Sequence, residues 1–271
     1  MSGFTIKLVV LVTAAQSGIS APDGLPSDTA PLESAFATEQ RVRFVERWLG
    51  PFDRQLATGP ASWLETLHTA GVCSAAVSSE TRESLNHDRQ MNGLVGGGRI
   101  WTMHTSDGRR HFEWSFRAGF DESARDHGEP SWRITYTRRE VSNHGPFFDD
   151  VPAAGAELRG ALDEIIDFAV AGEAPDWTVK SFESARAALD GDDGSPAPEG
   201  LMGAYVRSDE ARRLLDAAAK ADLFGAMGSW NDGMYTGNGD REEYERVSNR
   251  LYLAIDRAIV AAVNANNPDT C

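Results

Sequence analysis

Alternating apolar and polar positions mark a group of strands in the middle of the chain. Three runs are rich in Trp, Phe, Ile, Tyr and Thr, residues that favour half-buried strands. The runs are Arg99–Thr105, Arg109–Arg117 and Ser131–Arg138. Asp107 and Gly108 separate the first two runs and are typical of the centre of a two-residue type I′ turn. The pattern predicts a small antiparallel β-meander over about residues 98–139.

The expected turn also fixes which side chains share a face of this sheet. A two-residue turn places His104 opposite His111 and Trp101 opposite Trp114, and opposed residues share a face. The apolar face would then collect Trp101, Met103, Phe112, Trp114, Phe116, Trp132, Ile134 and Tyr136. Burying an aromatic side chain contributes roughly 2–3 kcal/mol, so we expect helices to cover this face.

The opposite face of the meander is polar and contains a candidate metal site. His104 and His111 would stand side by side, with Glu113 diagonal to His104. Two imidazoles and a carboxylate can bind a divalent metal such as zinc, or share a proton. The other interpretation is a solvated or helix-covered polar face with no cofactor, and the absence of an H-E-x-x-H motif favours it.

Helical periodicity dominates the rest of the chain. Apolar residues at three- and four-residue steps, with caps and terminating glycines, predict seven helices. They are Phe36–Leu49, Pro60–Gly71, Ser79–Met91, Pro152–Ala171, Trp177–Leu189, Asp209–Phe224 and Arg241–Ala265. Near the N-terminus, Thr5–Val12 favours a further strand, and the alternative is a signal-peptide core over Leu8–Ala15.

These elements predict an α+β fold in which the meander packs against the C-terminal helices. Residues 1–145 would hold the N-terminal helices and the sheet. Residues 146–271 would form an acidic helical region packed on the sheet as one compact unit.

Charge is distributed unevenly along the chain, which has a net charge of −15. Residues 1–139 hold 16 acidic and 15 basic side chains, whereas residues 140–271 hold 25 acidic and 11 basic ones, a net of −14. This balance argues against binding to nucleic acid or to an anionic membrane. It fits a basic protein partner, or simply a well-solvated protein. The meander itself is locally basic, which suits contact with the acidic half or with an anionic ligand.

A glycine-rich segment between the last two helices, Gly225–Asp240, contains a second candidate site. Long loops inside compact domains are often functional. In one interpretation the loop binds a partner through Ser229, Trp230, Asn231, Asp232 and Tyr235. In the other it is an ordered corner, with Trp230 in the core and glycines adopting positive φ.

Motifs that would indicate catalysis or a membrane anchor are missing from the sequence. There is no G-x-S-x-G, no H-E-x-x-H and no dinucleotide fingerprint. No apolar run approaches the ~20 residues that span a bilayer. Cys73 and Cys271 are the two cysteines, which predicts no disulfide framework, an inert thiol at Cys73 and a reducing cytoplasm.

We therefore expect a non-catalytic, cytoplasmic interaction module, of an inhibitor, immunity or accessory type, that uses its acidic helical surface. The arginine-rich composition is typical of a GC-rich bacterial genome. The alternative is a metal-binding protein or enzyme that uses His104, His111 and Glu113.

Overall fold

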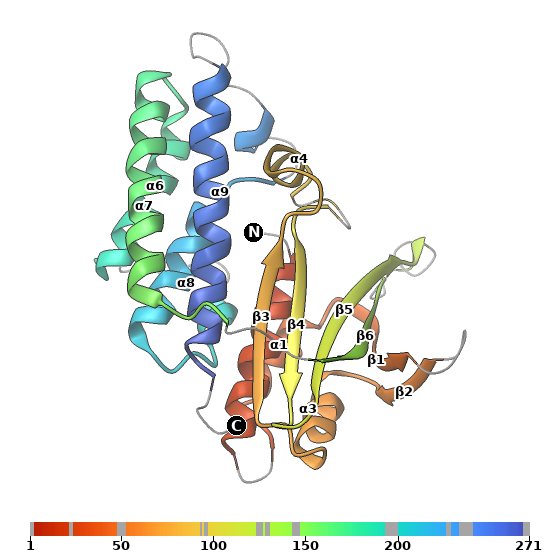
Figure 1. Ribbon diagram of the computed structural model, residues 1–271. Helices are drawn as coiled ribbons and strands as arrows, with labels where there is room; N and C mark the ends of the chain where they lie inside the picture. The colour runs from red at the N-terminus through yellow and green to blue at the C-terminus, as the bar shows by residue number, and fades with distance from the viewer. Residues whose placement is uncertain are drawn as a thin grey trace. The chain divides into compact units, whose positions relative to one another are not determined.

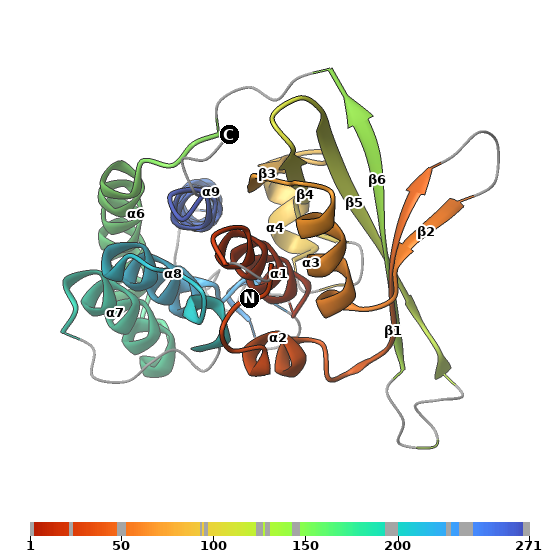
Figure 2. The ribbon, with the colours of Figure 1, turned by 90° about the horizontal axis from the view of Figure 1, so that it is seen from below.

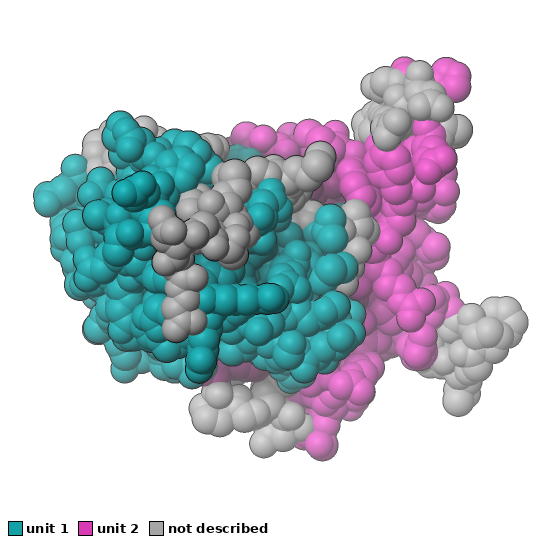
Figure 3. Space-filling model, turned by 90° about the horizontal axis from the view of Figure 1, so that it is seen from above, with its two compact units in different colours: residues 1–6, 79–100, 148–265 teal, residues 7–78, 101–147, 266–271 magenta. Residues whose placement is uncertain are grey.

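The computed structural model divides the chain into two compact units (Figure 3). It describes residues 3–21, 24–47, 53–92, 94, 97–122, 127, 131–142, 147–192, 200–225, 229–232 and 241–267. Unit 1 consists of residues 1–6, 79–100 and 148–265, and unit 2 of residues 7–78, 101–147 and 266–271. Both units are therefore assembled from separated stretches of the chain.

A six-stranded mixed sheet, in the order β2-β1-β6-β5-β4-β3, forms the framework of unit 2 (Figure 1). Its strands are β1 (Glu39–Arg47), β2 (Asp53–Ala57), β3 (Ser74–Glu80), β4 (Ile100–Ser106), β5 (His111–Phe120) and β6 (Trp132–Val141). β1 pairs antiparallel with β2, as β5 does with both β4 and β6, whereas β1 and β6 run parallel. The α+β composition is confirmed, but the strict three-stranded meander is wrong because other strands extend the sheet on both sides.

Strand β1 occupies a stretch that the spacing of apolar residues predicted to be helical. Val42 and Phe44 are buried, whereas Arg41 is exposed and Arg43 half-buried. This alternation has the two-residue period of a strand, and hydrogen bonds to β2 and β6 fix it. The predicted helix over residues 36–49 is wrong because several valines and phenylalanines fit both periods and the sheet partners decided between them.

The N-terminal apolar run forms helix α1 (Gly3–Ile19), so the predicted strand Thr5–Val12 is also wrong. Its apolar stretch is buried on every side, so periodicity does not separate helix from strand there. In unit 2, the Gln16 side chain donates to the carbonyl of Ala75, 2.7 Å away, and so joins α1 to β3.

The β4–β5 hairpin has a four-residue loop rather than a two-residue turn. Met103 lies opposite Trp114, and Ser106 lies opposite His111. The Asp107 carboxylate accepts the backbone N–H groups of Arg109 and Arg110, at 3.0 and 2.7 Å, so its side chain closes the loop. The predicted register is wrong by two residues. Because side chains alternate with a period of two, this shift leaves every side chain on its predicted face.

The aromatic face of the sheet packs against helix α3 (Pro60–Thr69) within unit 2 (Figure 2). Trp63 of α3 stacks on Phe44 with ring centroids 4.9 Å apart, and it meets Trp114 edge-on at 5.6 Å. Phe44 also stacks on Tyr136 at 4.9 Å. These rings come from α3 and from three strands, and they form the core of this unit. Whether the C-terminal helices also pack on the sheet stays a prediction.

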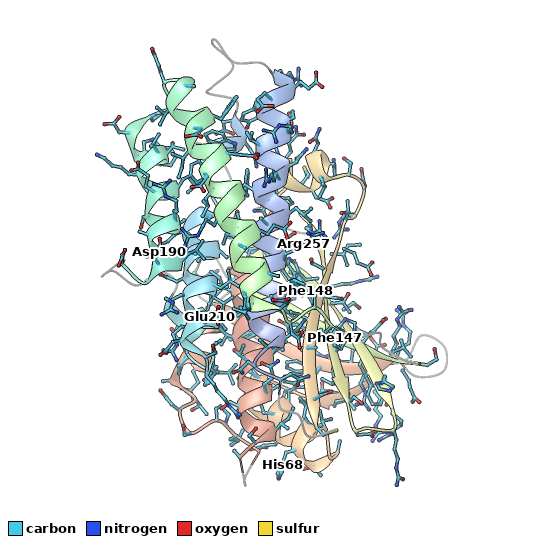
Figure 4. The ribbon with its side chains drawn as sticks, turned by 60° about the vertical axis from the view of Figure 1, so that its left-hand side comes forward. His68, Phe147, Phe148, Asp190, Glu210 and Arg257 are labelled. Carbon is cyan, nitrogen blue, oxygen red and sulfur yellow. The ribbon has the colours of Figure 1, made fainter. Side chains whose placement is uncertain are left out.

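Four helices form a bundle in unit 1 (Figure 2). They are α6 (Val151–Ala171), α7 (Asp176–Asp190), α8 (Asp209–Ala221) and α9 (Arg241–Asn264). Apolar stripes face inward, as the periodicity predicts, and ion pairs link neighbouring helices at the surface. Glu157 of α6 pairs with Arg257 of α9 at 2.8 Å, and Arg159 of α6 pairs with Asp190 of α7. Figure 4 labels Arg257 and Asp190 on their helices.

Shorter elements complete the described chain. They are α2 (Ala30–Ala35), α4 (Leu85–Gln90), η1 (Gly200–Gly203) and η2 (Trp230–Asp232). Helix α4 is much shorter than the predicted helix Ser79–Met91, whose first two residues belong to β3. No helix in the described ranges combines the length and the apolar character that crossing a bilayer requires.

Cys73 is disulfide-bonded, so the predicted inert free thiol is wrong. The other cysteine of the chain, Cys271, lies outside the described residues. A disulfide is unusual in a reducing cytoplasm. The cytoplasmic location was expected on the assumption that both cysteines are unpaired.

Candidate functional site

The predicted metal-binding residues lie on one face of the β4–β5 hairpin, in an arrangement that differs from the expected one. Glu113, and not His111, lies directly opposite His104, while His111 lies opposite Ser106. The two histidines are therefore diagonal neighbours. The expectation that they stand side by side is wrong because the Asp107 side chain lengthens the loop by two residues.

His104 and Glu113 both have other partners. The His104 ring is buried, its Nε2 lies 2.8 Å from Ser78 Oγ, and its ring contacts Phe147. Glu113 accepts two hydrogen bonds from the guanidinium of Arg139, at 2.9 and 2.5 Å. Across the residues that the structure describes, no three His, Cys, Asp or Glu side chains are placed to hold a metal ion. No observation therefore favours the metal alternative.

Trp230, the central residue of the predicted partner-binding loop, is fully buried in unit 1. Its indole N–H donates to Ser248 Oγ at 2.7 Å, and its carbonyl accepts the Tyr244 hydroxyl at 2.6 Å. Its ring also stacks on Tyr244 and meets Phe182 edge-on. Trp230 therefore lies in the core, where the ordered-corner interpretation places it. Its buried indole is not available to a partner in this conformation.

Arg89 of α4 holds the neighbouring Asn231 in place. The Arg89 guanidinium donates to Asn231 Oδ1 at 2.7 Å, and Asn231 donates back to the Arg89 carbonyl at 2.7 Å. The same guanidinium bonds to Asn249 and Glu245 of α9. Arg89 is only 1% exposed, although most of the residues around it in this segment are exposed or half-buried.

The remaining loop residues of the candidate site differ in their surroundings. Ser229 donates from its hydroxyl to the carbonyl of Gly225, and Asp232 is exposed. Tyr235 lies outside the described residues. The part of this loop that the structure describes is therefore mainly a packing element.

The acidic helical region exposes two large apolar side chains near the turn between α6 and α7. Val170 is 59% exposed and Trp177 is 46% exposed. Val170 lies in the last turn of α6 and Trp177 in the first turn of α7. The sequence predicted a helix starting at Trp177, but not that its indole would be in solvent.

The turn itself is a Schellman motif with an unusual residue in its left-handed position. Ala174 N–H donates to the Ala169 carbonyl at 2.8 Å, and Glu173 N–H donates to the Val170 carbonyl at 3.2 Å. Glu173 has φ of +54° and is the one non-glycine residue with positive φ in the described chain. Glycine is the usual residue here, and Gly172 lies one position earlier.

Three exposed carboxylates accompany the apolar pair, namely Asp167 of α6, Glu173 of the turn and Asp176 of α7. None of the three forms an ion pair with another residue in the described ranges. We call this group, together with Val170 and Trp177, the turn patch. It is an acidic surface with an aromatic anchor, and its chemistry suits binding rather than catalysis.

Comparison with known proteins gives no match among family models, curated proteins or solved structures.

Proposed function

We propose that the protein is a non-catalytic interaction module that binds a basic protein partner through the turn patch of unit 1. The exposure of Trp177 beside carboxylates is the observation that carries this proposal. Tryptophan is among the residues most enriched in binding hot spots, because one side chain buries a large area at a small entropic cost. An inhibitor-type or immunity-type role fits such a surface.

The conformation of Glu173 supports a role for its carboxylate. A non-glycine residue in the left-handed region costs roughly 1–2 kcal/mol, and glycine at position 173 would remove that cost. Backbone strain of this kind is characteristic of functional positions. The carboxylate places negative charge in the short turn that joins the two helices bearing Val170 and Trp177.

The partner that fits this surface presents lysine or arginine side chains around an apolar pocket. The pocket would take the indole of Trp177, and the basic rim would face Asp167, Glu173 and Asp176. The carboxylates would mainly increase the association rate, in a way that salt screens, while burial of the indole would slow dissociation.

A photocrosslinking experiment tests this function. A photoreactive phenylalanine analogue replaces Trp177 in one variant and Glu183, an exposed residue two turns further along α7, in the control. In cells, we expect position 177 to crosslink to a basic protein that position 183 does not capture. Purified partner should then bind the unmodified chain more weakly as salt increases. The same set of adducts at both positions, or an acidic partner at 177, would contradict the proposal.

The compartment in which binding occurs is a separate matter. A cytoplasmic location was expected from two unpaired cysteines, and the disulfide at Cys73 removes that basis. Alkylation of thiols in intact cells, followed by mass spectrometry of Cys73, decides it. A modified Cys73 indicates a reducing compartment, and a protected one indicates an oxidising compartment.

A further inference from the structure

One face of the sheet in unit 2 carries a cluster of arginines. Helix α3 lies along one side of the sheet (Figure 2), and the aromatic side chains pack against it. Because side chains alternate along a strand, the intervening residues of β1, β6 and β5 point to the other side. In one row across the strands, Arg43, Thr135 and Arg117 are neighbours. In the next row, Arg41 lies directly opposite Arg133. Adjacent strands are about 4.8 Å apart, so these four arginines, which we call the arginine face, form a compact array.

Few carboxylates compensate this positive charge. Arg133 pairs with Asp121 and donates to Gln40 at 2.8 Å. In the described part of the chain, the side chains of Arg41, Arg43 and Arg117 have no ion-pair partner. Like charges directly opposite each other destabilise a sheet, so Arg41 beside Arg133 is unfavourable for folding alone. An anionic ligand would remove this repulsion.

The surroundings of these arginines indicate the class of ligand. The interleaved residues are Ser115, Thr135 and Thr137, and no Phe, Tyr or Trp among the described strand residues points to this side. A protein partner would find no apolar anchor here, although such anchors carry most of the affinity in protein interfaces. Arginine, serine and threonine are common phosphate ligands in nucleic-acid complexes, and counterion release needs no apolar contact.

We infer that the arginine face binds the phosphate backbone of double-stranded nucleic acid without sequence preference. A single strand is a poorer fit, because proteins that hold single strands stack the bases on aromatic side chains. Phe120 and Trp132, at the end of the β5–β6 ribbon, belong to the opposite, aromatic face.

The net charge of −15 led to the expectation that the chain does not bind nucleic acid. That total sums the charges of the whole chain and does not describe the local charge of the arginine face. At physiological ionic strength the screening length is about 8 Å. A ligand at the arginine face is therefore influenced mainly by the charges beside it. Any carboxylate that lies more than a screening length from the arginine face acts on the ligand mainly at low ionic strength, where it weakens the long-range attraction.

Fluorescence anisotropy with a labelled 20-base-pair DNA duplex tests this inference on the full chain. We expect saturable binding at 50 mM salt that weakens about a hundredfold at 200 mM, since about four phosphate contacts give a log–log slope of roughly −3 to −4. The triple variant Arg41→Ala, Arg43→Ala, Arg117→Ala should bind about tenfold more weakly or worse. Arg54→Ala, Arg213→Ala, Arg241→Ala is the control that removes the same charge elsewhere, and it should bind like the unmodified chain.

Several results would overturn the inference. They are the absence of saturable binding at 50 mM salt, an equal loss of affinity in both triple variants, and tighter binding to the single strand. A fourth is preferential binding of poly-glutamate, which would assign the face to an acidic protein. If the first triple variant unfolds, the single variant Arg117→Glu, at an exposed position of β5, replaces it and should also weaken duplex binding.

Discussion

Arg99 and Asp256 form an ion pair in the interior of unit 1, with Arg99 Nε 2.6 Å from Asp256 Oδ2. Both side chains are less than a tenth exposed. Burial raises the pKa of Asp256 well above its usual value, and the nearby carboxylates Asp222 and Asp88 raise it further, while Arg99 opposes the shift. Keeping the Asp256 carboxyl ionised in the folded protein therefore costs free energy.

This relationship predicts how stability depends on pH. Between the usual pKa of 3.8 and the raised one, the folded state holds a proton at Asp256 that the unfolded state has lost. The contribution of Asp256 to the free energy of unfolding therefore falls as pH rises through this window, by at most about 1.4 kcal/mol per pH unit. The free energy of unfolding of Asp256→Asn, measured with urea between pH 4 and pH 7, should not show that decrease. Glu183→Gln is the exposed control, and an Asp256→Asn profile parallel to that of the unmodified chain would refute the prediction.

Removal of the buried guanidinium of Arg89 should be strongly destabilising. Arg89→Met keeps the apolar stem but leaves Glu245, Asn231 and Asn249 without their donor, so we expect a loss of about 3–5 kcal/mol. Denaturant unfolding followed by tryptophan fluorescence measures it. Arg82→Met, at an exposed position of the same segment, should change stability by less than about 0.5 kcal/mol.

A second substitution separates loss of the bonds from loss of packing at this position. Glu245→Gln in the Arg89→Met background removes the unpaired carboxylate, so part of the lost stability should return. Strictly additive effects of the two substitutions would mean that the Arg89–Glu245 pair is not coupled in the folded protein.

Replacement of the strained residue in the α6–α7 turn should stabilise the fold. Glu173→Gly allows the left-handed conformation without a Cβ penalty, and we expect a gain of about 1 kcal/mol in the free energy of unfolding. The control Glu183→Gly, inside α7, should lose about 1 kcal/mol. A loss of stability in Glu173→Gly would show that the carboxylate contributes to the turn itself and would weaken its proposed role in binding.

The side chain of Asp107 should stabilise the β4–β5 hairpin in a pH-dependent way. Hydrogen bonding by the backbone N–H of Arg110, with further bonds from its guanidinium and from Arg109, lowers the pKa of Asp107 to about 2. The stabilisation is present above the ordinary pKa of 3.8 and is lost as pH falls toward 2. Asp107→Ala should therefore be less stable than the unmodified chain at pH 6, and thermal unfolding should show the difference narrowing below pH 4. A constant difference would indicate that ionisation of Asp107 plays no part.

The sequence by itself determined the features that depend on local periodicity. The repeats of Leu158, Leu162 and Ile165 in α6, and of Leu251 and Ile255 in α9, predict the buried faces that the structure confirms. Alternation in β5 placed Trp114 inward and Glu113 on the other face, and this assignment survived a wrong register because the shift was two residues.

Tertiary structure alone decided the features that depend on distant partners. Val42 and Phe44 fit a helical spacing until β6, some 90 residues later, pairs beside them in parallel. Arg89 resembles a surface residue until Glu245 and Asn249 of α9 surround it. The arginine face likewise exists only because β1, β5 and β6 are neighbours. Caps and periodicity act over a few residues and can be read locally, whereas strand neighbours, buried charges and surface clusters are set by packing free energies between segments far apart in the chain.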